Sequence, residues 1–184
     1  MKIYHFGAED APVLLLLPGT CCHWKSNFGA VIPLLADSFR VLCVSYDGFD
    51  ETEQTEFPTM LEETEKIEAY LKTHCGGHIR AAYGCSLGGA CLTRFLALVE
   101  IPVDRAIIDG GITPYQLPYP VRKLILARDI LSFKLVANSR KILEAAFPPE
   151  RFTLPGHDPV KEYDAMEVYL KTYSNRTIHN FSGS

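Results

Sequence analysis

The chain has 184 residues, of which 47% are hydrophobic and 22% charged, and its formal net charge is −4. These values describe a folded globular protein of one domain, or of one domain with a small lid, and they exclude a disordered chain. They also exclude the strongly basic surface of a protein that binds nucleic acid or anionic membranes. We therefore expect neither nucleic acid nor a membrane among its partners.

The first residues and the cysteines indicate the compartment. The segment from Met1 to Phe6 lacks the long apolar stretch and cleavage site of a signal peptide, and the longest apolar run, 13–17, is too short to cross a bilayer. The six cysteines have neither the spacing of a disulfide framework nor that of a zinc site. We therefore expect buried free thiols, no metal ion and a cytoplasmic protein.

Short apolar runs alternate with helical patterns in the first half of the chain. Residues 12–18 are apolar on both faces of a strand, which is typical of a central parallel strand. A short helix over 27–36 and a second buried strand over 40–46 follow. After an acidic, turn-rich loop, a capping box at 59–62 predicts the start of a longer helix.

The same alternation continues with a third strand over 79–83, a helix over 87–100 and a fourth strand over 105–108. Strands joined by helices in this way pair in parallel, and the helices cover both faces of the sheet. The sequence therefore predicts an α/β fold, with three αβα layers around a mostly parallel central sheet.

After residue 112 the pattern changes, because prolines become frequent and no strong strand follows. Helical patterns run over 121–147 and 159–173, which indicates a helical cap or lid. We therefore interpret residues 1–112 as the core of the fold and residues 113–184 as the lid.

A glycine-rich turn with Ser86 at its centre, in the sequence Gly-Cys-Ser-Leu-Gly, lies between the third strand and the next helix. In a G-x-S-x-G turn of this kind the serine is strained, so the residues two positions before and after it must be small. Gly84 and Gly88 meet that requirement. A helix N-terminus beside the serine favours developing negative charge. We predict that Ser86 is a nucleophile; the alternative is a plain glycine-rich turn.

Acyl transfer also needs two backbone N–H groups that point at the oxyanion of the tetrahedral intermediate. The residue after the nucleophile supplies one of them, which is Leu87 here. A loop after an earlier strand supplies the other, and Thr20 or Cys21 lies in that loop. We therefore predict an oxyanion hole formed by Leu87 and one of these two residues, with Thr20 as our choice.

With these motifs the chain resembles the α/β-hydrolase superfamily, and in particular its lidded, single-domain, esterase-like members. Such proteins commonly have His-Gly after the first central strand and a D-G loop after the next; this chain has Pro18-Gly19 and Asp47-Gly48 there. The likeness covers about residues 10–112, and the serine turn is its most specific part. The resemblance implies a serine hydrolase that acts on a small acyl substrate and needs no metal or organic cofactor.

The acid and the histidine of this family follow the serine in the chain, on loops after later strands. Such strands are not recognisable after residue 112, so we expect either a fragment or shortened member of the family, or a member that completes its site in an unusual way. Asp109, at the end of the fourth predicted strand, is the candidate acid, and capping of a turn is its alternative role. If later strands are absent, the last strand exposes an unpaired edge, and we expect self-association through that edge.

His157 is the candidate base, because it lies in a Gly-His pair like the usual histidine loop of the family. It directly precedes a helix, however, for which Asp158 is the expected N-cap and Pro159 the expected first residue. His179, near the end of the chain in what resembles another lid helix, is a second candidate base. His23, beside the predicted oxyanion loop, is expected to line a pocket, to pack or to lie at the surface.

The sequence thus favours a hydrolase of esters or related acyl compounds. A non-catalytic protein of the same fold that binds a small ligand is the main alternative, because the acid and base are not firmly placed. Transfer of the acyl group to an alcohol or amine, or hydrolysis of a carbon–carbon bond, would use the same serine turn.

Overall fold

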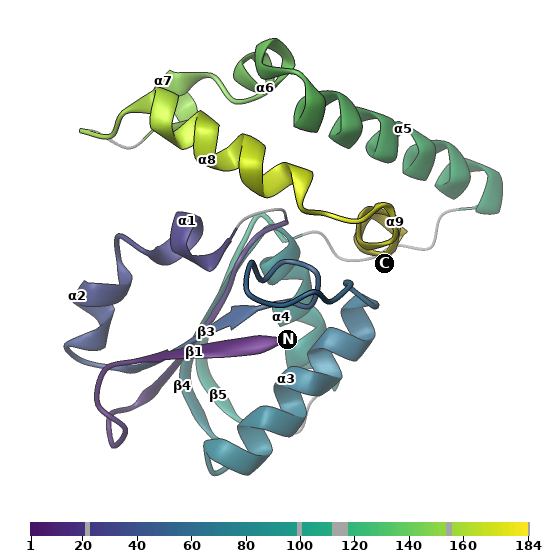
Figure 1. Cartoon of the computed structure of the whole chain (residues 1–184). Coiled ribbons are helices and arrows are strands. Elements are labelled where there is room, and N and C mark those ends of the chain that lie inside the picture. The colour runs from purple at the N-terminus through teal and green to yellow at the C-terminus, as the bar shows by residue number, and fades with distance from the viewer. Residues whose placement is uncertain (21–22, 99–100, 112–117, 154–155, 184) are drawn as a thin grey trace. The chain divides into compact units, whose positions relative to one another are not determined.

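The computed structural model describes residues 1–20, 23–98, 101–111, 118–153 and 156–183 (Figure 1). Its strands are β1 (Lys2–Phe6), β2 (Val13–Leu17), β3 (Arg40–Ser45), β4 (Ile79–Cys85) and β5 (Val103–Asp109). Its helices are α1 (Trp24–Phe28), α2 (Ile32–Ala36), α3 (Met60–His74), α4 (Leu87–Leu98), α5 (Tyr119–Asn138), α6 (Arg140–Ala146), α7 (Pro149–Phe152), α8 (Pro159–Lys171) and α9 (Asn175–Gly183).

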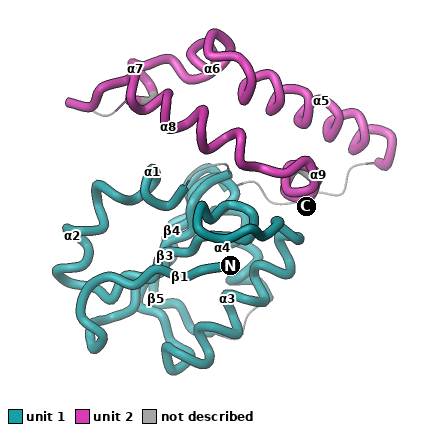
Figure 2. Tube along the Cα trace, viewed as in Figure 1, with its two compact units in different colours: residues 1–116, 184 teal, residues 117–183 magenta. Residues whose placement is uncertain are grey.

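The chain divides into two compact units, one of residues 1–116 and one of residues 117–183, here called the first and second unit (Figure 2). The boundary that the sequence suggests, at residue 112, falls on 112–117, which lie outside the described residues. Among the described residues, no helix is both long enough and apolar enough to cross a membrane.

The first unit contains a five-stranded sheet with the order β1-β3-β2-β4-β5. Three of its four strand pairs, β2–β3, β2–β4 and β4–β5, are parallel, which confirms the prediction of a mostly parallel sheet. The first strand, β1, pairs antiparallel with β3, from Lys2 opposite Ser45 to Phe6 opposite Val41. The sequence pattern does not predict this strand, because β1 is a short edge strand with only partial burial and no strong alternation.

The core of the first unit lies on both faces of β2 and β3, whose apolar runs produce it. Alternate side chains of these strands, Leu14 and Leu16 among them, pack against Trp24, Phe28 and Ile32 from α1 and α2. The intervening Leu15 and Leu17 of β2 are buried as well, on the opposite face. Figure 1 shows α1 and α2 on one side of the sheet and α3 and α4 on the other.

The helices of the first unit differ from the sequence-based prediction in one place and agree with it in another. The helix expected over 27–36 is divided into α1 and α2, and Pro33 lies in the first turn of α2. Proline lacks an N–H and disfavours the helical conformation of the preceding residue, so a continuous helix through this position is unfavourable. One half of the predicted capping box of α3 is seen: Thr59 Oγ1 accepts a hydrogen bond from the Glu62 N–H at 3.1 Å, and the Thr59 hydroxyl donates to the Glu62 carboxylate at 3.0 Å.

The sheet ends at β5, which is largely exposed. Every residue from Asp104 to Asp109 has an exposed side chain, including Ile107 at 60% and Ile108 at 45%. Among the described residues, β4 is the only strand that pairs with β5. This strand therefore presents a free edge within the part of the chain that the structure describes.

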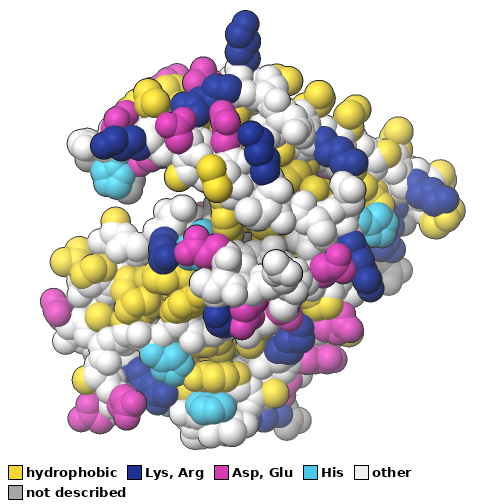
Figure 3. All heavy atoms as spheres, in the orientation of Figure 1, with side chains coloured by type: hydrophobic (Ala, Val, Ile, Leu, Met, Phe, Trp, Pro, Cys, Tyr) yellow, Lys and Arg dark blue, Asp and Glu magenta, His cyan; other side chains and the backbone are white. Residues whose placement is uncertain are grey.

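The second unit consists of α5 to α9 in its described parts. The helix expected over 121–147 is divided into α5 and α6 at Ser139, whose backbone is extended (φ −140°, ψ 108°). The second unit has a small core of its own, and Figure 3 shows further hydrophobic side chains exposed along α5. Its buried apolar residues are Ala137, Leu143, Tyr163, Leu170, Tyr173 and Ile178.

Candidate active site

Ser86 lies between β4 and α4 in a backbone conformation that side-chain-bearing residues rarely adopt. Its φ of +50° is the only positive value at a non-glycine position among the described residues. The Ser86 N–H donates to the carbonyl of Asp109 at 2.8 Å, and the Ser86 carbonyl accepts from the Ala90 N–H at 3.0 Å. These bonds hold the turn to both β5 and α4, while the Ser86 side chain is exposed. Strain of this kind persists only where the surrounding structure enforces it.

The glycines of the turn are required by close approach of backbone to backbone. A Cβ on Gly84 would lie 2.3 Å from the carbonyl oxygen of Gly88, and a Cβ on Gly88 would lie 2.0 Å from that of Leu17. A Cβ on Gly89 would lie 2.8 Å from the Cα of Gly111. The start of α4 therefore presses against the end of β2 and against the segment after β5. This close packing holds Ser86 in its strained conformation.

The loop after β2 lies directly beside the serine. A Cβ on Gly19 would lie 3.4 Å from the Cβ of Ser86, which is ordinary van der Waals contact. Thr20 follows Gly19 and is partly buried, whereas Cys21 lies outside the described residues. Leu87 is the first residue of α4, where an N–H has no carbonyl partner within its own helix. The structure thus brings Ser86, Leu87 and the Gly19–Thr20 loop together.

A side chain that the sequence did not single out fixes this loop. Asn27 of α1 accepts a hydrogen bond from the Gly19 N–H through its Oδ1, at 2.8 Å. The same oxygen accepts from the thiol of Cys85, the residue before Ser86, with a distance of 3.7 Å to the sulfur. Nothing in the sequence near Asn27 signals these contacts, because the residues involved come from three separate segments.

Asp109 ends β5 beside the serine turn, as predicted, and its carboxylate has a partner. Asp109 Oδ2 accepts a hydrogen bond from the Tyr83 hydroxyl at 2.7 Å. That hydrogen bond, together with partial burial, raises the pKa of Tyr83 to about 12. Tyr83 lies on β4, three residues before Ser86, and sequence reasoning did not identify it.

Two of the candidate histidines lie in the second unit. His157 precedes α8, and its Nδ1 is 2.7 Å from Glu162 Oε1 in the first turn of that helix. His179 lies within α9, where its Nδ1 is 3.4 Å from Asn180 Oδ1. Both are exposed, and each has its partner in its own segment.

His23, the third candidate, caps α1 in the first unit. Its Nδ1 accepts from the Lys25 N–H at 3.3 Å, and its Nε2 lies 3.7 Å from Glu51 Oε1. Burial lowers the pKa of His23 and outweighs the attraction of Glu51. His23 is thus the N-cap of α1 and is buried, and no described histidine of the first unit forms a hydrogen bond with Ser86.

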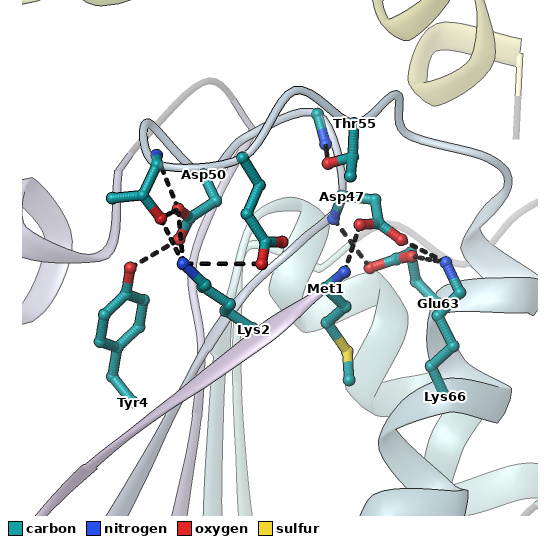
Figure 4. A network of polar contacts seen from close by, with 11 residues as sticks. Met1, Lys2, Tyr4, Asp47, Asp50, Thr55, Glu63 and Lys66 are labelled. Carbon is teal, nitrogen blue, oxygen red and sulfur yellow. Dashed lines mark hydrogen bonds and ion pairs between the residues drawn. The ribbon is translucent and has the colours of Figure 1, made fainter.

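The Asp47-Gly48 pair that supported the family resemblance belongs to a partly buried charge network (Figure 4). The carboxylate of Asp47 bonds to the Lys66 ammonium and to the Met1 amino group, and Lys66 also bonds to Glu63 at 2.8 Å. The Asp47 N–H donates to Glu63 at 3.2 Å. Burial alone would raise the pKa of Asp47, but its two cationic partners outweigh it and lower the pKa to about 2.

Glu63 within this network is fully buried, and burial raises the pKa of its carboxyl group. The loop after β3 is therefore anchored to α3 through charges. Among the described residues, Asp47 therefore serves to hold this loop in place. Gly48, with a φ of +77°, donates its N–H to Thr55 at 2.9 Å.

Comparison with known proteins identifies the family of this fold. A family model described as alpha/beta hydrolase fold matches residues 12–176. Comparison with curated protein sequences gives no match.

Three similar solved structures agree with the family match. An alpha/beta hydrolase family protein from Desulfitobacterium hafniense has a TM-score of 0.72 and 17% identity, over 99% of this chain and 71% of that one. An esterase from Rhodococcus sp. ECU1013 has a TM-score of 0.68 and 18% identity, over 97% and 66% of the two chains. An esterase from Exiguobacterium antarcticum has a TM-score of 0.69 and 14% identity, over 98% and 67%. At these identities the likeness concerns the fold.

Proposed function

The chain belongs to the α/β hydrolase fold family, and we propose that it is a serine hydrolase that acts on a small ester or related acyl substrate. The observation that carries this proposal is Ser86, an exposed hydroxyl at a φ of +50° between β4 and α4. A purely structural turn would not need a serine there, because glycine adopts a positive φ without strain. The two esterases with a similar fold support the same choice of chemistry.

In the proposed reaction, Ser86 Oγ attacks the carbonyl carbon of the substrate, and the carbonyl oxygen becomes an oxyanion. The Leu87 N–H at the start of α4 and the Thr20 N–H of the neighbouring loop stabilise that charge. A general base takes the proton of Ser86 as the new bond forms and returns it to the leaving alcohol. Water then attacks the acyl-enzyme and releases the acid. None of these steps requires a metal or an organic cofactor.

For the acid of this mechanism we propose Asp109. It is supported by its position, because its own carbonyl accepts the Ser86 N–H at 2.8 Å and its side chain lies at the end of the same strand.

The central test of the proposal is covalent labelling with a fluorophosphonate probe. We expect one adduct per chain on Ser86, with no adduct on Ser86→Ala. Hydrolysis of a p-nitrophenyl ester should fall by roughly 10⁴-fold or more in the same variant, because the nucleophile is lost. Ser26→Ala is the matched control, since Ser26 is an exposed serine of α1. Labelling that persists in Ser86→Ala would sink the proposal.

A second function is favoured by one specific observation. The carboxylate of Asp109 is bonded to Tyr83, and the ring of His157 is bonded to Glu162. The candidate acid is therefore bonded to a tyrosine instead of a histidine, and the candidate base to a carboxylate of the adjoining helix, as expected for a protein that binds a small acyl ligand without turnover. Thermal stabilisation by a non-hydrolysable ester analogue, combined with the absence of labelling, would favour this second function over the first.

A further inference from the structure

The side chain of Asn27 connects the two segments on either side of the candidate oxyanion site. Its Oδ1 accepts the Gly19 N–H at 2.8 Å from the loop after β2. The same oxygen accepts the Cys85 thiol, at 3.7 Å to the sulfur, from the end of β4. A single oxygen thus joins the residue before Thr20 to the residue before Ser86.

Asn27 is well placed to hold these segments, because its own helix is fixed. The flanking aromatic residues Trp24 and Phe28 are buried. The ring of Trp24 lies 4.7 Å from that of Tyr4, and the ring of Phe28 lies 5.8 Å from that of Tyr83, measured between centroids. The short helix α1 is therefore anchored on the sheet at both of its ends, and Asn27 projects from a rigid base.

Only an acceptor at this position can engage both groups. The Gly19 N–H and the Cys85 thiol are both donors, and a partly buried backbone N–H without an acceptor costs free energy. An apolar side chain of similar size would fill the space but would remove the oxygen that accepts the Gly19 N–H. Without that bond, the loop that carries Thr20 would lose its direct polar connection to α1.

We propose that Asn27 is a positioning residue, which holds the Gly19–Thr20 loop against the end of β4 so that the Thr20 N–H points at the oxyanion formed on Ser86. This inference rests on the proposed function. Asn27 does not touch the reacting atoms in this scheme, and its effect passes through the backbone of the loop. An oxyanion donor acts only at short range, so a displaced loop weakens the transition state more than it weakens substrate binding.

The test compares two substitutions of similar size, of which one removes the hydrogen-bond acceptor and the other keeps it. Asn27→Leu keeps the size of the side chain but removes the acceptor, whereas Asn27→Asp keeps an acceptor oxygen and adds a charge. We expect kcat to fall by about 10- to 100-fold in Asn27→Leu with little change in KM, since misplacement by about 1 Å costs up to about 100-fold. Asn27→Asp should have a kcat between that variant and the unchanged protein, because its negative charge opposes the oxyanion.

The rate of hydrogen exchange at the Gly19 amide, followed by NMR, measures the hydrogen bond between Gly19 and Asn27 independently of catalysis. We expect exchange of the Gly19 amide to be faster in Asn27→Leu and to stay slow in Asn27→Asp. A role in packing alone predicts similar exchange of the Gly19 amide in both variants, because each side chain fills about the space of asparagine. Ser26→Ala, one residue away on the same helix, should leave both the exchange and kcat unchanged.

The outcomes separate this inference from the proposed function. Unchanged Gly19 exchange and unchanged kcat in Asn27→Leu overturn the inference, as does equal loss in both variants. If the protein without substitutions shows no Ser86-dependent labelling, the proposed function fails, and the exchange of the Gly19 amide alone tests whether Asn27 holds the loop. Faster exchange in Asn27→Leu but not in Asn27→Asp then supports this role of Asn27, and equal exchange in both variants overturns it.

Discussion

Two turns in the molecule lead from a glycine into a helix and carry a candidate catalytic side chain, yet they are held in different ways. The turn at 84–89 leads into α4 and carries Ser86, and added Cβ atoms on its glycines would meet backbone atoms at 2.0 to 2.8 Å. The turn at 156–158 leads into α8 and carries His157. A Cβ on Gly156 would meet nothing within 4 Å, although its φ is +86°.

The conformation of the Ser86 turn is set by tertiary contacts, whereas that of the His157 turn is set by neighbouring residues. The first turn takes its shape from β2, from the segment after β5 and from α4, so the direction of the Ser86 side chain depends on the whole first unit. The second turn is determined within a few residues: Asp158 accepts the Val160 N–H at 3.0 Å, and His157 pairs with Glu162. A side chain that must meet a substrate accurately is better served by the first arrangement. Capping of α8 alone accounts for the residues of the second.

The largest expected effect that tests this contrast comes from placing the same methyl group in both turns. Gly88→Ala should destabilise the protein by more than about 4 kcal/mol, because its Cβ would meet the Leu17 carbonyl oxygen and the backbone must move. Gly156→Ala should cost only about 1 to 2 kcal/mol, which is the strain of a positive φ at alanine. Urea unfolding of both variants measures the difference, and equal losses would show that the two turns are held alike.

A smaller effect is expected from the cap of the second turn. Asp158→Ala should lower stability by about 1 kcal/mol, because the Val160 N–H loses its acceptor at the start of α8. Asp158→Asn is the control, since asparagine caps helices about as well as aspartate and should leave stability nearly unchanged. Helical circular dichroism during urea unfolding provides the measurement. A large loss in both variants would mean that the Asp158 charge, rather than the cap, stabilises this turn.

Much of the fold of the first unit is predictable from its sequence, because buried parallel strands produce apolar runs. The runs that become β2 and β3 are apolar on both faces, and they form the core of the sheet. The edge strand β1 is not predictable in this way, since it is only partly buried and its pairing with β3 depends on residues about 40 positions away. Two expected helices are each divided, one between Phe28 and Ile32 and the other at Ser139, because the hydrophobic pattern does not reveal where the chain must turn.

In the candidate site, too, only the residue that lies in a local pattern is predictable from the sequence. Ser86 is predictable because a G-x-S-x-G turn is a local pattern whose meaning follows from the flanking strand and helix. Asn27 and Tyr83 are not predictable, because their contacts join residues 8, 58 and 26 positions apart in the chain. No spacing rule describes such contacts, and only the folded sheet brings their partners together.

The smallest expected effect concerns the hydrogen bond between Tyr83 and Asp109 beside the first turn. This bond to a carboxylate and partial burial raise the pKa of Tyr83 from 10.0 to about 12. A tyrosine whose pKa is raised on folding stabilises the fold below its ordinary pKa, so this contribution is present below pH 10 and is lost as the pH rises through 12. The bond is near the surface, and we therefore expect a shift in titration and only a minor change in stability.

Asp109→Asn removes the negative charge but keeps an oxygen, and it should return the pKa of Tyr83 most of the way to 10.0. An ultraviolet titration of tyrosinate, taken as the difference between each protein and the same protein carrying Tyr83→Phe, isolates this group from the other tyrosines. If the carboxylate of Asp109 instead serves a histidine in solution, Tyr83 will titrate near 10 in the unchanged protein as well. The same measurement therefore decides whether the Asp109 carboxylate bonds to Tyr83 or is available to a catalytic histidine.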